Sequence, residues 1–127
     1  MIGRRGFVVG AVGLAMMPVD ALAFAEGRGM YGMIGKMRAV AGQRDALIAI
    51  LLEGTEAMPG CLSYIVARDP ADADAIWITE VWDRRESHAA SLRLPAVQAA
   101  IARGRPLIAG FESSVETEPV GGTGLAR

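Results

Sequence analysis

The spacing of apolar and polar residues changes along residues 31–118, and each change marks a new element. Residues 31–40 alternate at every second position, which is the pattern of a β-strand with one buried face. From residue 43 the apolar side chains recur with a helical period, and acidic side chains occupy the opposite stripe. Pro59-Gly60 is expected to end this helix, because both residues favour helix termination.

Two further strands are predicted over residues 61–68 and 75–82. The six residues between them include three Asp and one Pro, so the two strands are predicted to form a hairpin. A helix is then expected from Asp83, because Glu86 follows three residues later and completes a variant of the capping box.

A second helical segment and a last strand complete the pattern. Pro95 suits the first position of the segment, and Gly104 is expected to cap its end. The last strand is predicted over residues 107–118. Its alternation places apolar residues on one face and acidic residues on the other, namely Phe111, Val115 and Thr117 against Glu112, Glu116 and Glu118.

The predicted order over residues 30–118 is β-α-β-β-α-β, an α+β ferredoxin-like domain with an antiparallel four-stranded sheet. The helices must cover one face of this sheet. The other face carries Ile34, with Trp77 and Val81 as further candidates, so we expect a second copy of the chain to cover it in a homodimer. The Gly-rich residues 119–127 are expected to form a flexible tail.

Residues 1–25 follow a different pattern. Arg4-Arg5 precedes a short apolar run, and Ala21-Leu22-Ala23 has the small residues of a cleavage site, so the segment is predicted to be an export signal. Paired arginines before a Phe resemble the twin-arginine type. We therefore expect a periplasmic or secreted protein, whereas translation from Met30 would leave it in the cytoplasm. The apolar run is too short to span a bilayer, so no stable membrane anchor is expected.

The composition is that of one globular domain, with 52% apolar residues, 21% charged residues and a formal net charge of −1. Lys and Arg are scattered, so nucleic acid is not an expected partner. Cys61 is the single cysteine and His88 the single histidine in the 127 residues. One histidine without arranged partners does not make a zinc site, so no metal site is predicted.

Four residues remain as candidates for chemistry, namely Tyr64, Glu80, Trp82 and His88. Strand parity places Glu80 and Trp82 on one face, and a cleft between this strand end and the next helix would make His88 a base near neutral pH. Each candidate also has a structural interpretation. His88 would lie on a polar helix surface, and its spacing alone favours this interpretation. Trp82 would be a core residue, and Tyr64 would lie at a subunit interface. Glu80 would pair with Arg84 or Arg85.

Two runs of sequence resemble the antibiotic biosynthesis monooxygenase (ABM) family, namely MPGCLSY at residues 58–64 and IWITEVWD at residues 76–83. The resemblance extends from about Tyr31 to Phe111 and is greatest to quinol monooxygenase-like members. It implies a dimeric α+β barrel and, for some members, oxygenation without metal, flavin or haem, so no cofactor is expected. Haem-degrading members rely on an Asn and a His whose positions fall at Gly35 and Ile101 here, which disfavours that activity.

The resemblance further implies that a small aromatic substrate, a quinol or polyphenol, is oxidised with O₂ in an apolar chamber beside Trp82. His88 is then the expected base, Tyr64 a hydrogen-bond donor and Trp82 a wall against the substrate, with Glu80 and Met33 as further substrate contacts. Two other functions stay open. One is a non-catalytic dimeric small-molecule binding or stress protein, and the other is an isomerase for a phosphorylated or oxygenated metabolite, which the lack of a basic cluster disfavours.

Overall fold

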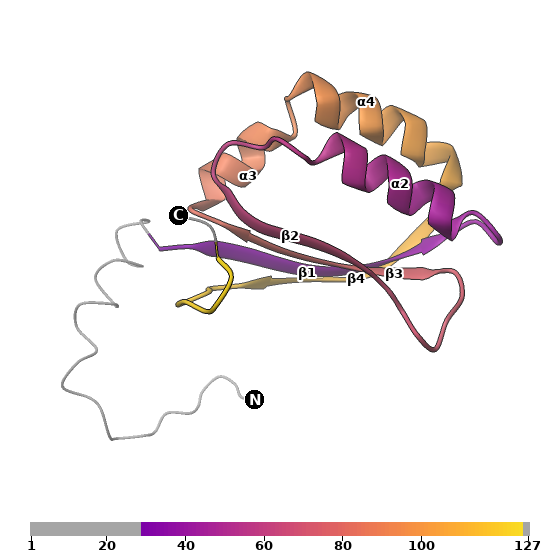
Figure 1. Ribbon diagram of the computed structural model, residues 1–127, viewed down its shortest axis with the longest axis horizontal. Coiled ribbons are helices and arrows are strands. Elements are labelled where there is room, and N and C mark those ends of the chain that lie inside the picture. Colours follow the sequence, from indigo (N-terminus) through magenta and orange to yellow (C-terminus); the bar gives the residue numbers. More distant parts are fainter. Residues whose placement is uncertain (1–28, 126–127) are drawn as a thin grey trace.

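The computed structural model describes residues 29–125, which form one sheet with helices on one side (Figure 1). The predicted export signal, residues 1–25, lies outside the described residues. In chain order the elements are β1 (Tyr31–Ala39), α2 (Arg44–Gly54), β2 (Cys61–Arg68), β3 (Ala75–Trp82), α3 (Arg85–Ser91), α4 (Pro95–Gly104), the 3-10 helix η2 (Arg105–Leu107) and β4 (Ile108–Thr117).

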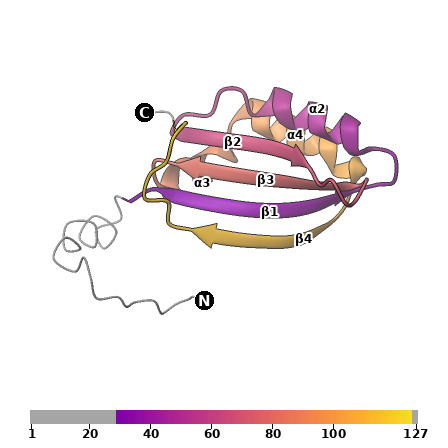
Figure 2. The ribbon, with the colours of Figure 1, turned by 60° about the horizontal axis from the view of Figure 1, so that its bottom comes forward.

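The sheet has the strand order β2-β3-β1-β4, and its strand pairs are antiparallel. Helices α2, α3 and α4 lie on the same face of the sheet (Figures 1 and 2). This arrangement confirms the predicted ferredoxin-like fold, with α3 and α4 in place of one second helix. The predicted hairpin is also confirmed, with β2 and β3 spanning the expected residues.

The core lies between the sheet and the helices, in two clusters. One cluster joins Leu47 of α2 to Met37 and Ile76 of the sheet. The other surrounds Trp82, whose side chain is 1% exposed and packs with Tyr31, Met58 and Val97. The alternation predicted over residues 31–40 is confirmed in β1, where the odd-numbered Tyr31, Met37 and Ala39 are buried.

The first helix is shorter than predicted. Helix α2 ends at Gly54 rather than next to Pro59, and the Thr55 hydroxyl donates to the Leu51 carbonyl at 2.6 Å. A Cβ on Gly54 would lie 2.3 Å from Cβ of Ala100, so the close approach of α4 requires glycine there. Met58, which the predicted helix would have included, instead reaches the core from an irregular segment.

The predicted cap at Asp83 is wrong, because α3 begins at Arg85. The Asp83 N–H donates to the Gly60 carbonyl at 2.8 Å, which holds Asp83 to the β2 end of the hairpin instead of to the helix. The predicted cap at Gly104 is also wrong. Gly104 has a helical φ of −79° and belongs to α4, and its small size lets Leu47 Cδ1 approach to 3.2 Å of where a Cβ would stand.

A β-bulge in β4 overturns the predicted single acidic face. Lys36 pairs with Ser113 but Met37 pairs with Phe111, so Glu112 is an extra residue that reverses the alternation. Glu112 therefore binds Lys36 and Arg38 on the uncovered face of the sheet, whereas Glu116 lies on the helix-facing side. Phe111 correspondingly lies on the opposite face from Val115 and Thr117.

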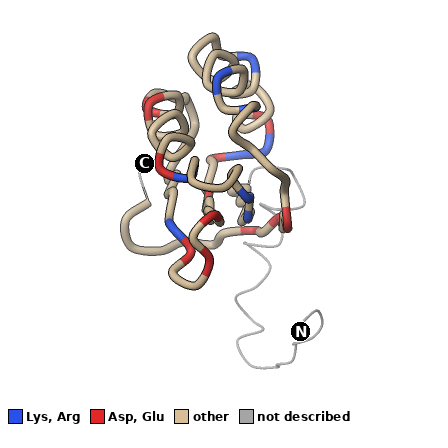
Figure 3. Tube along the Cα trace, turned by 90° about the vertical axis from the view of Figure 1, so that its right-hand side faces the viewer, with Lys and Arg blue, Asp and Glu red and all other residues tan. Residues whose placement is uncertain are grey.

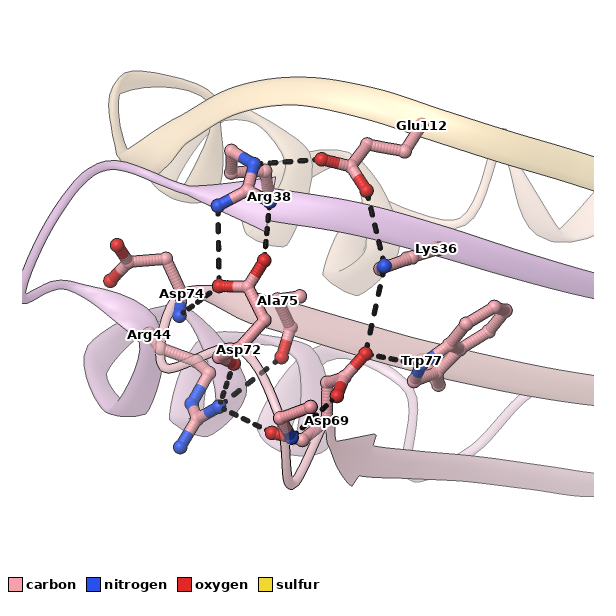
Figure 4. A network of polar contacts seen from close by, with 10 residues as sticks. Lys36, Arg38, Arg44, Asp69, Asp72, Asp74, Ala75, Trp77 and Glu112 are labelled. Carbon is pink, nitrogen blue, oxygen red and sulfur yellow. Dashed lines mark hydrogen bonds and ion pairs between the residues drawn. The ribbon is translucent and has the colours of Figure 1, made fainter.

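Polar residues at one end of the uncovered face form an ion-pair network (Figure 4). Arg38 binds Asp72 and, at 2.7 Å, Glu112, while Lys36 lies 3.3 Å from Glu112 and 3.6 Å from Asp69. The Trp77 indole donates to Asp69 at 3.0 Å. Elsewhere along the described chain, acidic and basic residues are interspersed (Figure 3), in keeping with the near-neutral net charge.

The centre of the uncovered face is more apolar. Ile65, Thr79, Ile34 and Val115 form one row across the four strands. The exposed fractions of Ile34, Val115 and Ile65 are 37%, 54% and 55%. After Thr117 the chain has no helix or strand up to residue 125, and Pro119 lies against Gly32.

Candidate active site

Three of the predicted site residues form one row across the helix-facing side of the sheet. Glu80 of β3 pairs with Tyr64 of β2 on one side and with Met33 of β1 on the other. Directly paired residues on antiparallel strands are close enough for their side chains to interact. The row exists because the three strands have the same inward parity, and Trp82 follows Glu80 on the same face of β3.

Glu80 is the acid at the centre of this row, and its side chain is 15% exposed. Its Oε1 accepts a hydrogen bond from the Trp82 indole Nε1 at 2.9 Å and lies 3.9 Å from the His88 Nε2. The buried indole therefore fixes the carboxylate, and the imidazole stands next to it. When His88 is protonated, the two form an ion pair.

Helix α3 carries His88, and Arg85 of the same helix binds the sheet. The guanidinium donates to both carboxylate oxygens of Glu116, at 2.9 and 3.2 Å, and lies 4.5 Å above the Tyr31 ring. The Tyr31 hydroxyl donates to the same carboxylate at 2.8 Å. One turn later, the His88 ring lies 5.4 Å from the Tyr31 ring and 5.5 Å from the Trp82 ring.

A cavity of about 560 Å³ lies between α2, α4 and the start of β4, within the range that holds small-molecule ligands. It forms because α4 packs mainly on α2 rather than on the sheet. Most of its lining is apolar, namely Met37, Leu47, Leu51, Leu92, Val97, Ala100, Ile101, Gly104, Ile108, Ala109, Gly110 and Phe111. Thr55, Tyr64 and Arg105 complete the lining.

A second cavity of about 180 Å³ adjoins the first, since both are lined by Met37 and Phe111. Glu80 and Met33 belong to its lining, with Lys36, Ser113 and Ser114 as further polar residues. The predicted site is thus divided. Tyr64 lines the larger cavity, and Glu80 and Met33 line the smaller one.

Trp82 and His88 line neither of these two cavities. Val97 separates the indole from the larger cavity, because it packs on Trp82 and also lines that cavity. The expected wall formed by Trp82 is therefore absent there, since its full burial leaves no indole face for a ligand. Trp82 and His88 therefore act on the site only through their contacts with Glu80.

Burial raises the pKa of the Tyr64 phenol well above its ordinary value, and the negative charge of Glu80 adds to the effect. Tyr64 consequently stays protonated at neutral pH. Its hydroxyl makes no hydrogen bond to another residue within 29–125, so it is available as a donor to a ligand. Burial also raises the pKa of the Cys61 thiol, which keeps it in the unreactive protonated form.

The model of the antibiotic biosynthesis monooxygenase family matches residues 30–103, more than half of the chain. The chain belongs to this family. Its resemblance to the ABM family, first evident in the runs at residues 58–64 and 76–83, is therefore confirmed. No curated protein matches the chain.

Solved structures assigned to the same family share this fold. A protein of Chloroflexus aurantiacus is 71% identical with a TM-score of 0.75, and the match covers 76% of this chain and 99% of that one. A protein of Deinococcus radiodurans is 26% identical with a TM-score of 0.61, covering 72% and 94% of the two chains. At 17% identity, a Caulobacter crescentus protein reaches a TM-score of 0.68 over 80% and 99%, which shows the fold alone.

Apart from Tyr64, Glu80 and Met33, the sequence alone does not single out the cavity residues of this ABM domain. Val97, Ala100, Ile101 and Gly104 recur with helical spacing, a pattern that also fits a helix packed fully on a core. Phe111 was assigned to the wrong face because a bulge has no reliable signal in one sequence. The small residues at Gly54 and Ala100 were the one available sign that α4 packs closely on α2.

Residues 29–125 contain no group of three or more His, Cys, Asp or Glu side chains arranged to hold a metal ion. Among these residues there is also no helix with the length and apolarity of a membrane span.

Proposed function

We propose that the protein is a cofactor-independent monooxygenase that transfers one oxygen atom of O₂ to a quinol or polyphenol bound beside Glu80. The observation that carries this proposal is a largely buried carboxylate that lines a cavity next to a larger apolar one. Membership of the ABM family supports the same class of reaction.

The first step is removal of a proton from the bound quinol. Glu80 lines the smaller cavity and so meets the substrate hydroxyl, while His88 stands 3.9 Å behind it. The pair acts as the base, with Glu80 accepting the proton and His88 sharing it. Carboxylates and imidazoles are side chains that commonly act as general bases in enzymes.

The deprotonated quinol then passes one electron to O₂, which gives a semiquinone radical and superoxide. These combine in a C–O bond to form a ring hydroperoxide. Its O–O bond breaks, one oxygen leaves as water and the other stays on the ring. Hydroquinone and O₂ thus become hydroxyquinone and water, and the quinol supplies all the electrons. The Tyr64 hydroxyl stabilises the negative charge that develops on oxygen.

The assembly and location belong to the same proposal. The exposed apolar row of Ile65, Ile34 and Val115 fits a homodimer that buries the uncovered face of the sheet. Residues 1–25 fit an export signal that directs the protein to the periplasm or beyond.

Oxygen uptake in the presence of a panel of hydroquinones and anthrones tests the proposal. The protein is expected to raise the rate above that of uncatalysed oxidation for at least one compound, and His88→Ala is expected to lower that rate. Uptake at the uncatalysed rate across the panel, together with tight binding, would instead support a non-catalytic binding protein. Unchanged uptake by His88→Ala would remove His88 from the base.

A further inference from the structure

The two adjoining cavities differ in size and in chemistry. The smaller one, about 180 Å³, has Glu80, Lys36, Ser113 and Ser114 as the polar residues of its lining. The larger one, about 560 Å³, is lined mostly by apolar residues. Because Met37 and Phe111 line both, a single elongated molecule would extend from one into the other.

The smaller cavity suits one aromatic ring. Apolar cavities of about 150 Å³ in proteins bind benzene, so about 180 Å³ is matched to a single hydroquinone ring. A ring in this position would place its hydroxyl at Glu80.

The larger cavity suits an apolar chain rather than a second polar ring. The Thr55 hydroxyl already donates to the Leu51 carbonyl at 2.6 Å, so its proton is not free for a ligand. Arg105 is exposed on η2 at the rim, which leaves the Tyr64 hydroxyl as the one inner polar group of the lining. The rest of the wall offers only contacts with aliphatic and aromatic carbon.

Exposed apolar side chains at the larger cavity support the same occupant. Phe111, Leu92 and Ile101 are 73%, 48% and 40% exposed. Phe111 stands where the two cavities meet, so a chain passing from one cavity to the other would cover it. Covering such side chains is favourable in proportion to the apolar area removed from water.

We infer that the substrate is a hydroquinone with an alkyl or prenyl substituent, with its ring in the smaller cavity beside Glu80 and its chain in the larger cavity. The oxidation of the ring rests on the proposed function. The binding of the chain does not, because it depends only on the larger cavity.

The test uses hydroquinones with straight alkyl chains from methyl to octyl and two measurements. Dissociation constants are measured by calorimetry without oxygen, and kcat/KM is measured from oxygen uptake. Each added methylene is expected to tighten binding about fourfold until the chain fills the cavity. Ile101→Trp, which places a larger side chain in the cavity, is expected to flatten this dependence. Leu52→Trp, at another exposed apolar position that lines neither cavity, is expected to retain this dependence on chain length.

The outcomes separate the two proposals. Equal affinity for all chain lengths, or an undiminished dependence in Ile101→Trp, would overturn the inference even if oxygen uptake were observed. Chain-dependent binding without oxygen uptake would support the chain site and overturn the proposed reaction. If Ile101→Trp does not fold, Leu92→Trp provides the same test from another wall of the cavity.

Discussion

The indole Nε1 of Trp82 donates to Oε1 of Glu80 at 2.9 Å, within one strand and on one face of the sheet. Trp82 is thus the buried residue that orients the carboxylate of the candidate site. The uncovered face holds a matching pair, since the Trp77 indole donates to Asp69 at 3.0 Å. The chain therefore contains its own control for the effect of an indole on a carboxylate.

Trp82→Phe is expected to lower kcat for oxygen uptake, because Glu80 loses the donor that orients it. Trp77→Phe loses the same kind of hydrogen bond at a residue that lines neither cavity and is expected to keep kcat. Each change should lower the free energy of unfolding by about 1–3 kcal/mol, measured by denaturant titration. Equal kcat values in the two variants would show that the indole of Trp82 does not position the carboxylate.

Arg44 is expected to stabilise the loop of the β2–β3 hairpin. Its Nη1 donates to the carbonyls of Asp69, Asp72 and Ala75 at 3.3, 2.8 and 3.4 Å. Arg44→Met removes these charge-assisted hydrogen bonds, while each carbonyl keeps a backbone N–H donor, and should reduce the free energy of unfolding by about 1–3 kcal/mol. Arg68→Met removes an exposed ion pair with Asp45 and should cost less than about 1 kcal/mol. A smaller loss for Arg44→Met than for Arg68→Met would contradict this role.

Stability is expected to fall in acid. The Arg38 guanidinium holds the pKa of Asp72 and Glu112 below their ordinary values, and the Ala71 N–H does the same for the pKa of Asp69. Because the folded-state pKa is lower than the unfolded one, this stabilisation is complete above the ordinary carboxyl pKa of about 4 and is lost as the pH falls below it.

Denaturant midpoints measured between pH 6 and pH 2 test this dependence. Asp72→Asn should make the decline shallower, whereas Glu56→Gln, an exposed carboxyl outside the network, should not. Identical slopes for wild type and Asp72→Asn would show that the network does not contribute to the acid dependence.

We predict that the uncovered face of the sheet forms a homodimer interface. One charge introduced into this interface should dissociate the dimer. Ile34→Asp places a carboxylate in the centre of the apolar row and should give a monomer in sedimentation experiments at micromolar concentration. Leu52→Asp is the control, because Leu52 is 51% exposed on the helical side. A monomeric wild type, or an Ile34→Asp variant that remains dimeric, would contradict this assembly.

The sequence was sufficient for the fold because its strands have strict periods and clear turns. The hairpin of β2 and β3 follows from two alternating runs around the loop that begins with Asp69-Pro70, and the structure agrees residue by residue. Parity alone also places Glu80 with Trp82, and pairing of neighbouring strands then adds Tyr64 and Met33 to the same row.

Where the predictions from the sequence are wrong, a tertiary contact determines the local structure. Asp83 is a residue type that often caps helices, but here its backbone N–H donates a hydrogen bond to the Gly60 carbonyl. Glu112 interrupts a regular alternation because two cations, Lys36 and Arg38, lie beside it across β1. The larger cavity depends on how far α4 stands from the sheet, and no local pattern specifies that distance.

The central claim is that a quinol bound beside Glu80 receives an oxygen atom from O₂, and isotope labelling tests it most directly. Under ¹⁸O₂, a hydroquinone that the protein oxidises should give a hydroxyquinone with one ¹⁸O by mass spectrometry. Glu80→Gln should form it about 10²- to 10⁴-fold more slowly, whereas Glu112→Gln should match the wild type. An unlabelled quinone with hydrogen peroxide as the co-product, or equal rates for the wild type and Glu80→Gln, would contradict the claim.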